Sequence, residues 1–281
     1  MYIKTAFLVA ITGGEKWMTE KKIDLSISIV VYKDYLSAFE TIKSIETFTN
    51  VNIKKIIYVI DNSNEKSDSK KRFLKKIKLY EDICFISTEK NLGFSKAHNL
   101  VIEKLYSKYH AIVNPDVILH EDSFEKIINF MELNQKDVGM VIPKIVDPNG
   151  ILQLAYRREL TILDMVVHFF NAKLFRKRYD YHTMKEKNFD KSFSVPFGQG
   201  SFLVIQTSLF KKLNGFDERF FMYMEDADLC KRVNQVSKLK YFPNSVVEHK
   251  WVRGSHKNLK LLKIHIVSMV KYFQKWGIKL F

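Results

Sequence analysis

The run Ser26-Ile27-Ser28-Ile29-Val30-Val31-Tyr32 is apolar and rich in β-branched residues, and it ends at the polar pair Lys33-Asp34. Such a run is typical of a strand buried inside a parallel sheet. Apolar residues at helical spacing follow from Ala38 to Phe48. The same order recurs with strands expected at residues 56–60, 83–87 and 111–113. Strand and helix thus alternate at the spacing of βαβ units, which predicts an α/β fold with a mostly parallel, doubly wound sheet.

Polar or small residues stand where these strands end. Tyr32 closes the first strand, Asp61 the second, and Asn91-Leu92-Gly93-Phe94 and Asn114-Pro115-Asp116 follow the third and fourth. Ligands of doubly wound sheets bind beyond the carboxyl ends of the strands. We therefore expect these residues to converge on one crevice, although each cluster alone would also fit an ordinary strand-to-helix turn.

The aspartates of this set suit different parts of a nucleotide ligand. Asp61 can accept hydrogen bonds from a base or ribose, and a turn role is an equal alternative on spacing alone. Asp116 follows Pro115, which fixes the local backbone and aims the carboxylate out of the strand end. Because a hard divalent cation on a diphosphate needs only one or two protein carboxylates, Asp116 is a candidate ligand of Mg²⁺ or Mn²⁺. His249, which follows a late strand, is a second candidate, although a lone histidine is more often a core or surface group.

Further elements are expected in the second half of the chain. A strand at 138–144, a tight turn at 147–150 and an apolar helix at 162–170 precede a polar, unpatterned segment at 180–191, which suggests a mobile loop over the cleft. Gly200 lies in a glycine-rich turn before an apolar strand at 202–205, where glycine lets the backbone approach a ligand. Ser208 is expected to cap a short helix, and two short strands are expected at 240–243 and 246–247.

An acidic stretch from Gly215 to Cys230 places five acids among phenylalanines, a tyrosine and methionines. Carboxylates in such surroundings are poorly hydrated, so their pKa values rise toward the range of a useful general base. Glu225, Asp226 and Asp228 would also lie in the first turn of a helix, where the macrodipole favours negative charge. An acidic helix start is therefore the competing interpretation.

Composition indicates a globular protein with an anionic partner. The chain has 281 residues, 46% of them apolar, a formal charge of +15 and a pI near 9.5. This charge suits nucleic acid, a nucleotide or a membrane face. Residues 1–24 are expected to be a leader, disordered or absent from the native product if translation starts at Met18. No run of about 20 apolar residues occurs that would span a bilayer.

Residues 256–281 are expected to form an amphipathic, basic extension. On a helical wheel Leu259, Leu262, Ile266, Met269, Phe273 and Trp276 share one arc, and Lys260, Lys263, Lys271 and Lys275 share the opposite one. One interpretation is a helix packed on the domain with a solvated lysine face. The other is a helix that lies on an anionic membrane surface.

With these motifs in view, the chain resembles the inverting, GT-A-fold glycosyltransferases of family 2, and among them the rhamnosyltransferase-like members. The resemblance runs from about Ile27 to Trp276, so residues 25–255 would form the GT-A domain. It is carried by Gly215 to Cys230, by Asn91 to Phe94 with Asn99, by the glycine-rich turn at Gly200 and by His249. Two departures are Asn114-Pro115-Asp116 in place of Asp-x-Asp, and bulky basic residues at 96–98 where a small one is frequent.

The resemblance implies that Asp61 contacts the nucleotide base, that Asp116 holds the metal and diphosphate, and that Asp226 is the general base, with Glu225 as the less favoured substitute. It also implies a dTDP-L-rhamnose donor and a lipid-linked saccharide acceptor of a bacterial surface polysaccharide, and a cytoplasmic enzyme peripheral to the cell membrane. The donor site would include Tyr32, Asn91, Gly93, Phe94, Asn99, Asn114 and Gly200.

Other functions are less well supported by the residues. A UDP-hexose donor is the nearest alternative. A sugar-phosphate nucleotidyltransferase would usually carry a glycine-rich phosphate loop after the first strand, and Lys33-Asp34-Tyr35-Leu36 has none. A nucleic-acid-binding protein would suit the charge, but no recognised reading motif occurs and the acidic stretch would repel phosphate.

Overall fold

Four parallel strands form the part of the sheet that the first repeats predict. The computed structural model describes residues 6–9, 23–170, 175–250 and 258–280. The strands are β2 (Leu25–Val31), β3 (Lys55–Asp61), β4 (Ile83–Thr88) and β5 (Tyr109–Val113), in the spatial order β4-β3-β2-β5. Their registers pair Val31 with Asp61, Asp61 with Ser87, and Ile29 with Val113. The carboxyl ends of these strands therefore meet at one edge, as predicted.

Both faces of β2 are buried, one against apolar side chains and the other against a buried polar layer. Ile27 and Ile29 lie in the hydrophobic core. On the other face, the Ser28 hydroxyl is 2.7 Å from Nδ1 of His98, and the Ser26 hydroxyl is 2.8 Å from Nδ1 of His110. Burial lowers the pKa of His110 to about 3, so this polar layer is neutral at physiological pH.

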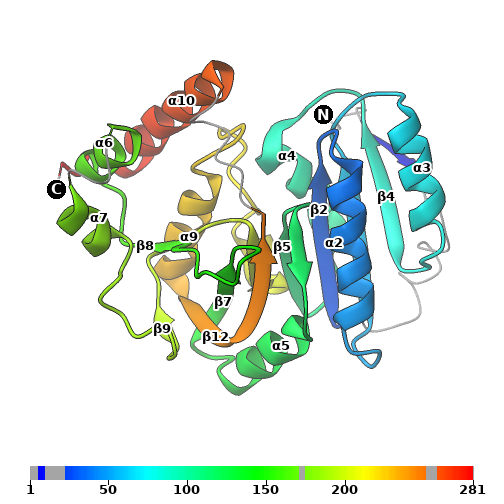
Figure 1. The fold of residues 1–281 in the computed structure, drawn as a ribbon, viewed down its shortest axis with the longest axis horizontal. Coiled ribbons are helices and arrows are strands. Elements are labelled where there is room, and N and C mark those ends of the chain that lie inside the picture. Colours follow the sequence, from blue (N-terminus) through cyan, green and yellow to red (C-terminus); the bar gives the residue numbers. More distant parts are fainter. Residues whose placement is uncertain (1–5, 10–22, 171–174, 251–257, 281) are drawn as a thin grey trace.

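Helices cover the sheet: α2 (Tyr35–Phe48), α3 (Asp68–Ile77), α4 (Gly93–Asn99), the 3₁₀ helix η1 (Ile102–Lys104) and α5 (Ser123–Leu133). Asp34, Ser67 and Asp122 cap α2, α3 and α5 by accepting a first-turn amide hydrogen. Figure 1 shows α2 and α3 on the same side of the sheet. Helix α4 ends at Asn99, after which the chain turns back and the Ser107 hydroxyl lies 2.7 Å from the Ser26 hydroxyl of β2.

Strands with mixed pairing extend the sheet beyond β5: β12 pairs parallel with β7, and the other pairings along this path are antiparallel. The complete order is β1-β4-β3-β2-β5-β11-β7-β12-β6, with β11 (Phe202–Gln206), β7 (Val138–Val146), β12 (Lys238–His249) and β6 (Val117–Leu119). The prediction of two short final strands is wrong, because β12 is one strand. Its register against β7 shifts between Phe242 and Val246. Pro243 lies in this irregularity, where it has no amide hydrogen to give to the ladder.

A smaller sheet and two helices lie at one end of the molecule (Figure 1). The strands are β8 (Tyr156–Arg157) and β10 (Phe197–Gly198), with β9 (Phe193–Ser194) beside β12, and the helices are α6 (Ile162–Phe170) and α7 (Arg176–His182). The prediction of an unpatterned loop from residue 180 is wrong at its start, which is the last turn of α7. The buried carboxylate of Asp164 accepts hydrogen bonds from the Arg178 guanidinium at 2.6 and 2.9 Å and so holds α7 against α6.

Part of the predicted leader belongs to the sheet. Strand β1 (Ala6–Val9) pairs antiparallel with β4, with Ala6 opposite Thr88. The rest of the expected leader, residues 1–5 and 10–22, and the possible start at Met18 lie outside the described residues.

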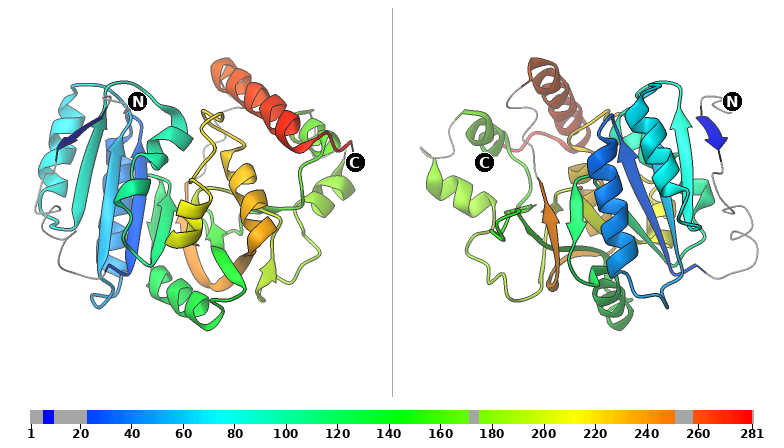
Figure 2. Two further views of the ribbon diagram at one scale, coloured as in Figure 1. Left: turned by 180° about the vertical axis from the view of Figure 1, so that it is seen from behind. Right: turned by 45° about the vertical axis from the view of Figure 1, so that its right-hand side comes forward.

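The last helices are α8 (Thr207–Lys212), α9 (Glu225–Val236) and α10 (Leu259–Trp276). Helix α8 begins after Gln206, so the prediction that Ser208 caps it is wrong. Helix α10 has the predicted bounds, and Figure 2 shows it crossing beside α9. Among the described residues, no helix is both long and apolar enough to cross a bilayer.

The face by which α10 packs differs from the predicted one. Its buried residues include His265, Ser268, Tyr272 and Phe273. Lys271 donates a hydrogen bond to the carbonyl of Arg219, and Lys275 forms two ion pairs, so the predicted solvated lysine face is wrong for both. Lys260 and Lys263 are exposed. The exposed apolar side chains beside them are Leu259 and Ile266, which the helical wheel places on the packed arc, and Val267 and Val270, which it places on neither arc.

Candidate active site

Asp61 is fully buried at the carboxyl end of β3. Its Oδ1 accepts hydrogen bonds from the Tyr35 hydroxyl and the Ser63 amide, both at 3.1 Å, and its Oδ2 lies 2.5 Å from Nζ of Lys70 on α3. The carboxylate is therefore fixed by a turn, a tyrosine and a cation. Lys70 and Tyr35 were not identified from sequence, because their contacts with Asp61 are made across the ends of two helices.

A tight turn after β4 brings Asn91 and Gly93 to the same edge. Oδ1 of Asn91 accepts the Gly93 amide hydrogen at 2.9 Å and one from the Asn62 side chain at 3.0 Å. Gly93 has φ of +81°, and a Cβ there would lie 2.2 Å from the carbonyl oxygen of Phe221. Only glycine therefore allows the end of β4 to touch the acidic stretch.

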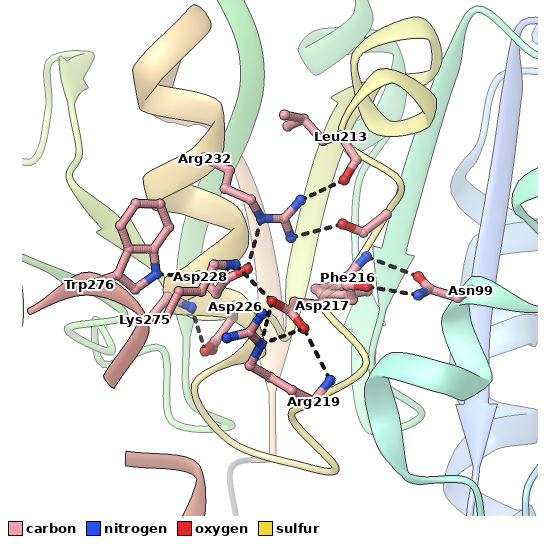
Figure 3. A network of polar contacts seen from close by, with 12 residues as sticks. Asn99, Leu213, Phe216, Asp217, Arg219, Asp226, Asp228, Arg232, Lys275 and Trp276 are labelled. Atoms are coloured by element: carbon pink, nitrogen blue, oxygen red, sulfur yellow. Dashed lines mark hydrogen bonds and ion pairs between the residues drawn. The ribbon is translucent and has the colours of Figure 1, made fainter. Parts of the chain in front are cut away.

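The acidic stretch is also held by Phe94 and Asn99. The Phe94 amide donates to the carbonyl of Phe221 at 2.7 Å. The Asn99 side chain forms two hydrogen bonds with the backbone of Phe216: its Nδ2 donates to the carbonyl at 2.8 Å, and its Oδ1 accepts from the amide at 2.9 Å (Figure 3). Asn99 and Gly93, which were predicted to contact the donor, thus organise the loop that precedes α9. Their predicted contacts with a donor stay predictions.

Asp116 and His249 lie together at the next strand ends. His249 pairs in register with Val117 across β12 and β6, and the Lys250 amide donates to the carbonyl of Asp116. Nε2 of His249 is 3.3 Å from Oδ1 of Asp116. The His249 side chain is 2% exposed, and its Nδ1 lies 3.3 Å from Oε1 of Gln153. Gln153, which sequence reasoning did not single out, therefore orients the imidazole.

A chain of backbone contacts connects this edge with Asp226. The Asn114 amide donates to the carbonyl of Ser201 at 2.8 Å, since Phe202 pairs with Val113 across β11 and β5. The neighbouring Gly200 amide donates to Oδ2 of Asp226 at 3.0 Å. A Cβ at Gly200 would lie 3.1 Å from the Cβ of Asp226, so glycine permits this approach. The end of β5 and the start of α9 are thereby brought together.

Glu225 and Asp226 differ in their surroundings. Burial and the neighbouring Asp226 charge raise the pKa of Glu225 well above its usual value. Burial also raises the pKa of Asp226, but hydrogen bonds from the amides of Gly200 and Ala227 and the charge of Arg157 oppose the rise. Asp226 is thus the carboxyl that can be ionised and still take up a proton.

Arg157 was not singled out from sequence. It lies on β8, in register with Phe197 of β10, and its guanidinium is 5.8 Å from the centre of the Phe197 ring. This small sheet leads directly into the Gly198–Gly200 turn, which explains how a cation acts on Asp226 from a distant part of the chain.

The third acid of α9, Asp228, has a structural environment. It is fully buried, and Figure 3 shows it between α9 and α10. It accepts hydrogen bonds from Arg232 at 2.7 Å, Lys275 at 2.6 Å and the Trp276 indole at 2.9 Å. The acidic stretch is therefore neither only a helix start nor a uniform cluster, because its carboxyl groups have different surroundings: Asp228 is paired with cations, whereas Oε2 of Glu225 is buried without a hydrogen-bond partner among the described residues.

Tyr32 is the predicted donor-site residue that stands most apart from these contacts. Its side chain is 50% exposed, and Nζ of Lys33 lies 5.5 Å from its ring centre. Tyr32 follows β2 at the same edge of the sheet. Among the described residues, no hydrogen bond or ring contact joins it to Asp61 or Asp116.

Comparison with known proteins identifies the family. The sequence model described as Glycosyl transferase family 2 matches residues 26–213, more than half of the 281. The chain belongs to glycosyl transferase family 2. The match ends before Asp226, His249 and α10.

Curated relatives of this family 2 chain include two rhamnosyltransferases. An N-acetylglucosaminyl-diphospho-decaprenol L-rhamnosyltransferase of Mycobacterium tuberculosis is 26% identical over 187 residues, which cover 62% of this chain and 60% of the relative. Rhamnosyltransferase WbbL of Escherichia coli K12 is 24% identical over 193 residues, which cover 65% of this chain and 70% of WbbL. The chain thus spans about three fifths of the length of the M. tuberculosis relative.

Solved structures confirm the predicted fold class. The crystal structure of GalNAc-T7 with UDP, GalNAc and Mn²⁺ superposes with a TM-score of 0.63 at 17% identity, over 83% of this chain and 44% of that one. The crystal structure of S. aureus TarS 1–349 superposes with a TM-score of 0.57 at 13% identity, and the match covers 88% of this chain and 66% of that one. At these identities the likeness concerns the fold, a GT-A-like arrangement of a mixed sheet between helices.

The residues around Asp116 fit a divalent ion that is carried by a ligand. Oδ1 of Asp116 is a buried oxygen without a hydrogen-bond partner among the described residues, and it faces the imidazole Nε2. No group of three or more metal-binding side chains occurs in the described part of the chain. A site with one carboxylate and one imidazole suits Mg²⁺ or Mn²⁺ when phosphate oxygens and water complete the shell.

Proposed function

We propose that this family 2 chain is an inverting glycosyltransferase that moves L-rhamnose from dTDP-L-rhamnose to a lipid-linked saccharide in bacterial surface polysaccharide synthesis. The observation that carries the proposal is the hydrogen bond from the Gly200 amide to the Asp226 carboxylate. This bond holds a partly desolvated carboxylate near the strand end of Asn114 and Asp116. The names of the M. tuberculosis and E. coli relatives support the sugar and the class of acceptor.

Asp226 is the general base of the proposed reaction. Its carboxylate takes the proton of an acceptor hydroxyl while that oxygen attacks the anomeric carbon and the nucleoside diphosphate leaves from the opposite side, so the configuration inverts. A positioned base of this kind contributes roughly 10²–10⁴ in rate. Glu225 is the less favoured substitute, because burial and the Asp226 charge raise its pKa well above the usual value and so favour its protonated form.

The strand ends hold the donor. In this proposal Asp61 contacts the nucleotide base, and Asp116 with His249 would hold Mg²⁺ or Mn²⁺ on the diphosphate. When bound, that ion offsets the negative charge that develops on the leaving nucleotide. Tyr32, Asn91 and Asn114 are the further donor contacts, whereas Gly93, Phe94, Asn99 and Gly200 shape the backbone around them.

The acceptor's lipid explains the outward face of α10. Leu259, Ile266, Val267 and Val270 are exposed there beside Lys260 and Lys263. Residues 249–281 contain eight lysines and arginines and no aspartate or glutamate. Basic, apolar helix faces of this kind bind anionic membrane surfaces. The enzyme would thus act in the cytoplasm, peripheral to the inner face of the cell membrane.

A vesicle assay tests the membrane contact. Sedimentation with phosphatidylglycerol vesicles should fall strongly for Val267→Asp with Val270→Asp, and should be absent with neutral phosphatidylcholine. Unchanged sedimentation of the double variant would remove the membrane from the proposal and leave the transfer reaction standing.

A donor panel tests the reaction. Thermal unfolding is measured with dTDP-L-rhamnose, UDP-glucose and UDP-N-acetylglucosamine, each with and without Mn²⁺, and sugar transfer to a diphospholipid-linked N-acetylglucosamine acceptor is followed in parallel. At 100 times its Kd a ligand stabilises the fold by about 2.7 kcal/mol. We expect dTDP-L-rhamnose to stabilise and to turn over. Turnover of a UDP-hexose alone would replace dTDP-L-rhamnose by that sugar nucleotide as the proposed donor. A hexose donor is the alternative because another relative, 23% identical, is named Low-salt glycan biosynthesis hexosyltransferase Agl10 of Haloferax volcanii.

A further inference from the structure

Helix α10 runs along the loop that precedes the proposed base. Four of its side chains contact the stretch at 217–228 through polar groups. Ser268 donates to the carbonyl of Met222 at 2.9 Å, Lys271 to that of Arg219 at 2.8 Å, Lys275 pairs with Asp217 at 2.8 Å and Asp228 at 2.6 Å, and Trp276 donates to Asp228 at 2.9 Å. Figure 3 shows Lys275 and Trp276 reaching this stretch.

The loop beneath these contacts has an unusual backbone. Tyr223 and Met224 have φ of 69° and 67°, a left-handed conformation that such residues rarely adopt. It persists only where surrounding groups hold it. The His265 ring stacks on Tyr223 with 4.4 Å between ring centres, and Ser268 holds the adjoining Met222 carbonyl. Glu225 and Asp226 follow directly, so their position depends on this pair of residues.

Lys275 occupies the centre of the connection. It is 20% exposed and lies between the carboxylates of Asp217, at the start of the loop, and Asp228, one turn into α9. Asp228 keeps Arg232 and Trp276 as partners if Lys275 is lost, whereas Asp217 keeps only the exposed Arg219 as an ion-pair partner among the described residues. Removing Lys275 should therefore loosen the loop without unfolding α9.

We propose that Lys275 is a positioning residue of the catalytic centre: from α10 it fixes the loop at 217–224 and thereby the orientation of Asp226 toward the acceptor. This inference rests on the proposed function, in which Asp226 is the base. It places a required part of the site some 60 residues beyond residue 213, where the family match ends.

We expect the loss of the Lys275 ion pairs to change the pKa of Asp226, the proposed base. The charged or titratable groups that act on Asp226 or are acted on by it are Glu225 and Cys230 of its own helix, Arg157 of β8 and Tyr272 of α10. Burial is the largest cause of the raised pKa of Asp226. A looser loop admits water, so this pKa should fall toward its ordinary value.

The test compares Lys275→Met with Lys275→Arg and with Lys126→Met, a lysine that pairs with Glu121 at 2.6 Å away from the site. For Lys275→Met we expect kcat to fall roughly 10- to 100-fold, as small misplacements of catalytic groups cause. Binding of dTDP or UDP, measured by calorimetry, should change less than about twofold, because the strand ends do not contact Lys275. The acidic limb of kcat against pH should move to lower pH, and Lys275→Arg should recover most of the activity.

Other outcomes decide against the proposal. If Lys275→Met lowers activity only in proportion to the folded fraction, with an unchanged pH profile, Lys275 is a structural residue only. If that variant does not fold, Ser268→Ala removes just the bond to Met222, and an unchanged kcat and pH profile there would overturn the proposal. Turnover of Asp226→Asn at the normal rate would instead refute the proposed function, so the two failures are distinguishable.

Discussion

Nε2 of His249 lies 3.3 Å from Oδ1 of Asp116, across the pairing of β12 with β6. These residues are 133 positions apart, and only the antiparallel register of His249 opposite Val117 brings them together. In the proposed function this carboxylate oxygen and this imidazole nitrogen would form one side of a divalent ion's shell.

This pair predicts a metal-dependent donor complex. Asp116→Asn and His249→Ala should each lose most of the extra thermal stabilisation that Mn²⁺ adds to the nucleotide complex, because the carboxylate or imidazole ligand is gone. Thermal shift with dTDP and UDP, each with and without Mn²⁺, measures this. His120→Gln is the control, since His120 is an exposed histidine that pairs with Glu248. Equal Mn²⁺ effects in all variants would exclude the site.

Gly93 should be far more sensitive to substitution than Gly150. Both have positive φ, +81° and +77°, but a Cβ at Gly93 would lie 2.2 Å from the Phe221 carbonyl, whereas a Cβ at Gly150 would meet nothing within 4 Å. Gly150→Ala should therefore cost about 1 kcal/mol of unfolding free energy, and Gly93→Ala about 3 kcal/mol because overpacking adds to the backbone cost. Urea unfolding compares them, and equal losses would show that the close contact is unimportant.

Glu225 should make stability depend on pH. Its pKa is raised in the fold, so its stabilising contribution is complete below the unfolded value of about 4.3 and is lost as pH rises through the folded value. Glu225→Gln mimics the protonated form. The variant should match the parent's Tm near pH 4 and exceed it increasingly at higher pH. Glu103→Gln, at an exposed position, should show no such trend. A constant Tm difference would argue against a buried proton on Glu225.

The sequence was sufficient for the four parallel strands β2 to β5 and for the edge where their carboxyl ends meet. β-branched runs carry a local signal, and βαβ spacing indicates that the strands are parallel. Asp116 and His249 were also proposed separately as candidate ligands of the same ion, each from its place after a strand. These features depend on neighbours in sequence or on one rule of topology.

Contacts made by tertiary packing were not visible in the sequence. The helical wheel treated Lys271 and Lys275 as solvated, but Asp217 and Asp228 draw Lys275 inward, and buried His265 and Ser268 face the loop. In the same way Arg157, Gln153 and Lys70 act on site residues from other elements. A polar side chain that serves a partner distant in sequence has the same local pattern as one that faces water.

The most direct measurement is the steady-state rate of sugar transfer by Asp226→Asn beside Glu225→Gln, with nucleotide binding measured for both. A base at Asp226 predicts that Asp226→Asn loses roughly 10²–10⁴ in kcat while dTDP binding is nearly unchanged. Glu225→Gln should keep a far larger share of kcat, because the raised pKa of Glu225 favours its protonated form, which glutamine resembles. Ordinary turnover by Asp226→Asn, or a greater loss for Glu225→Gln, would contradict the assignment of Asp226 as the base.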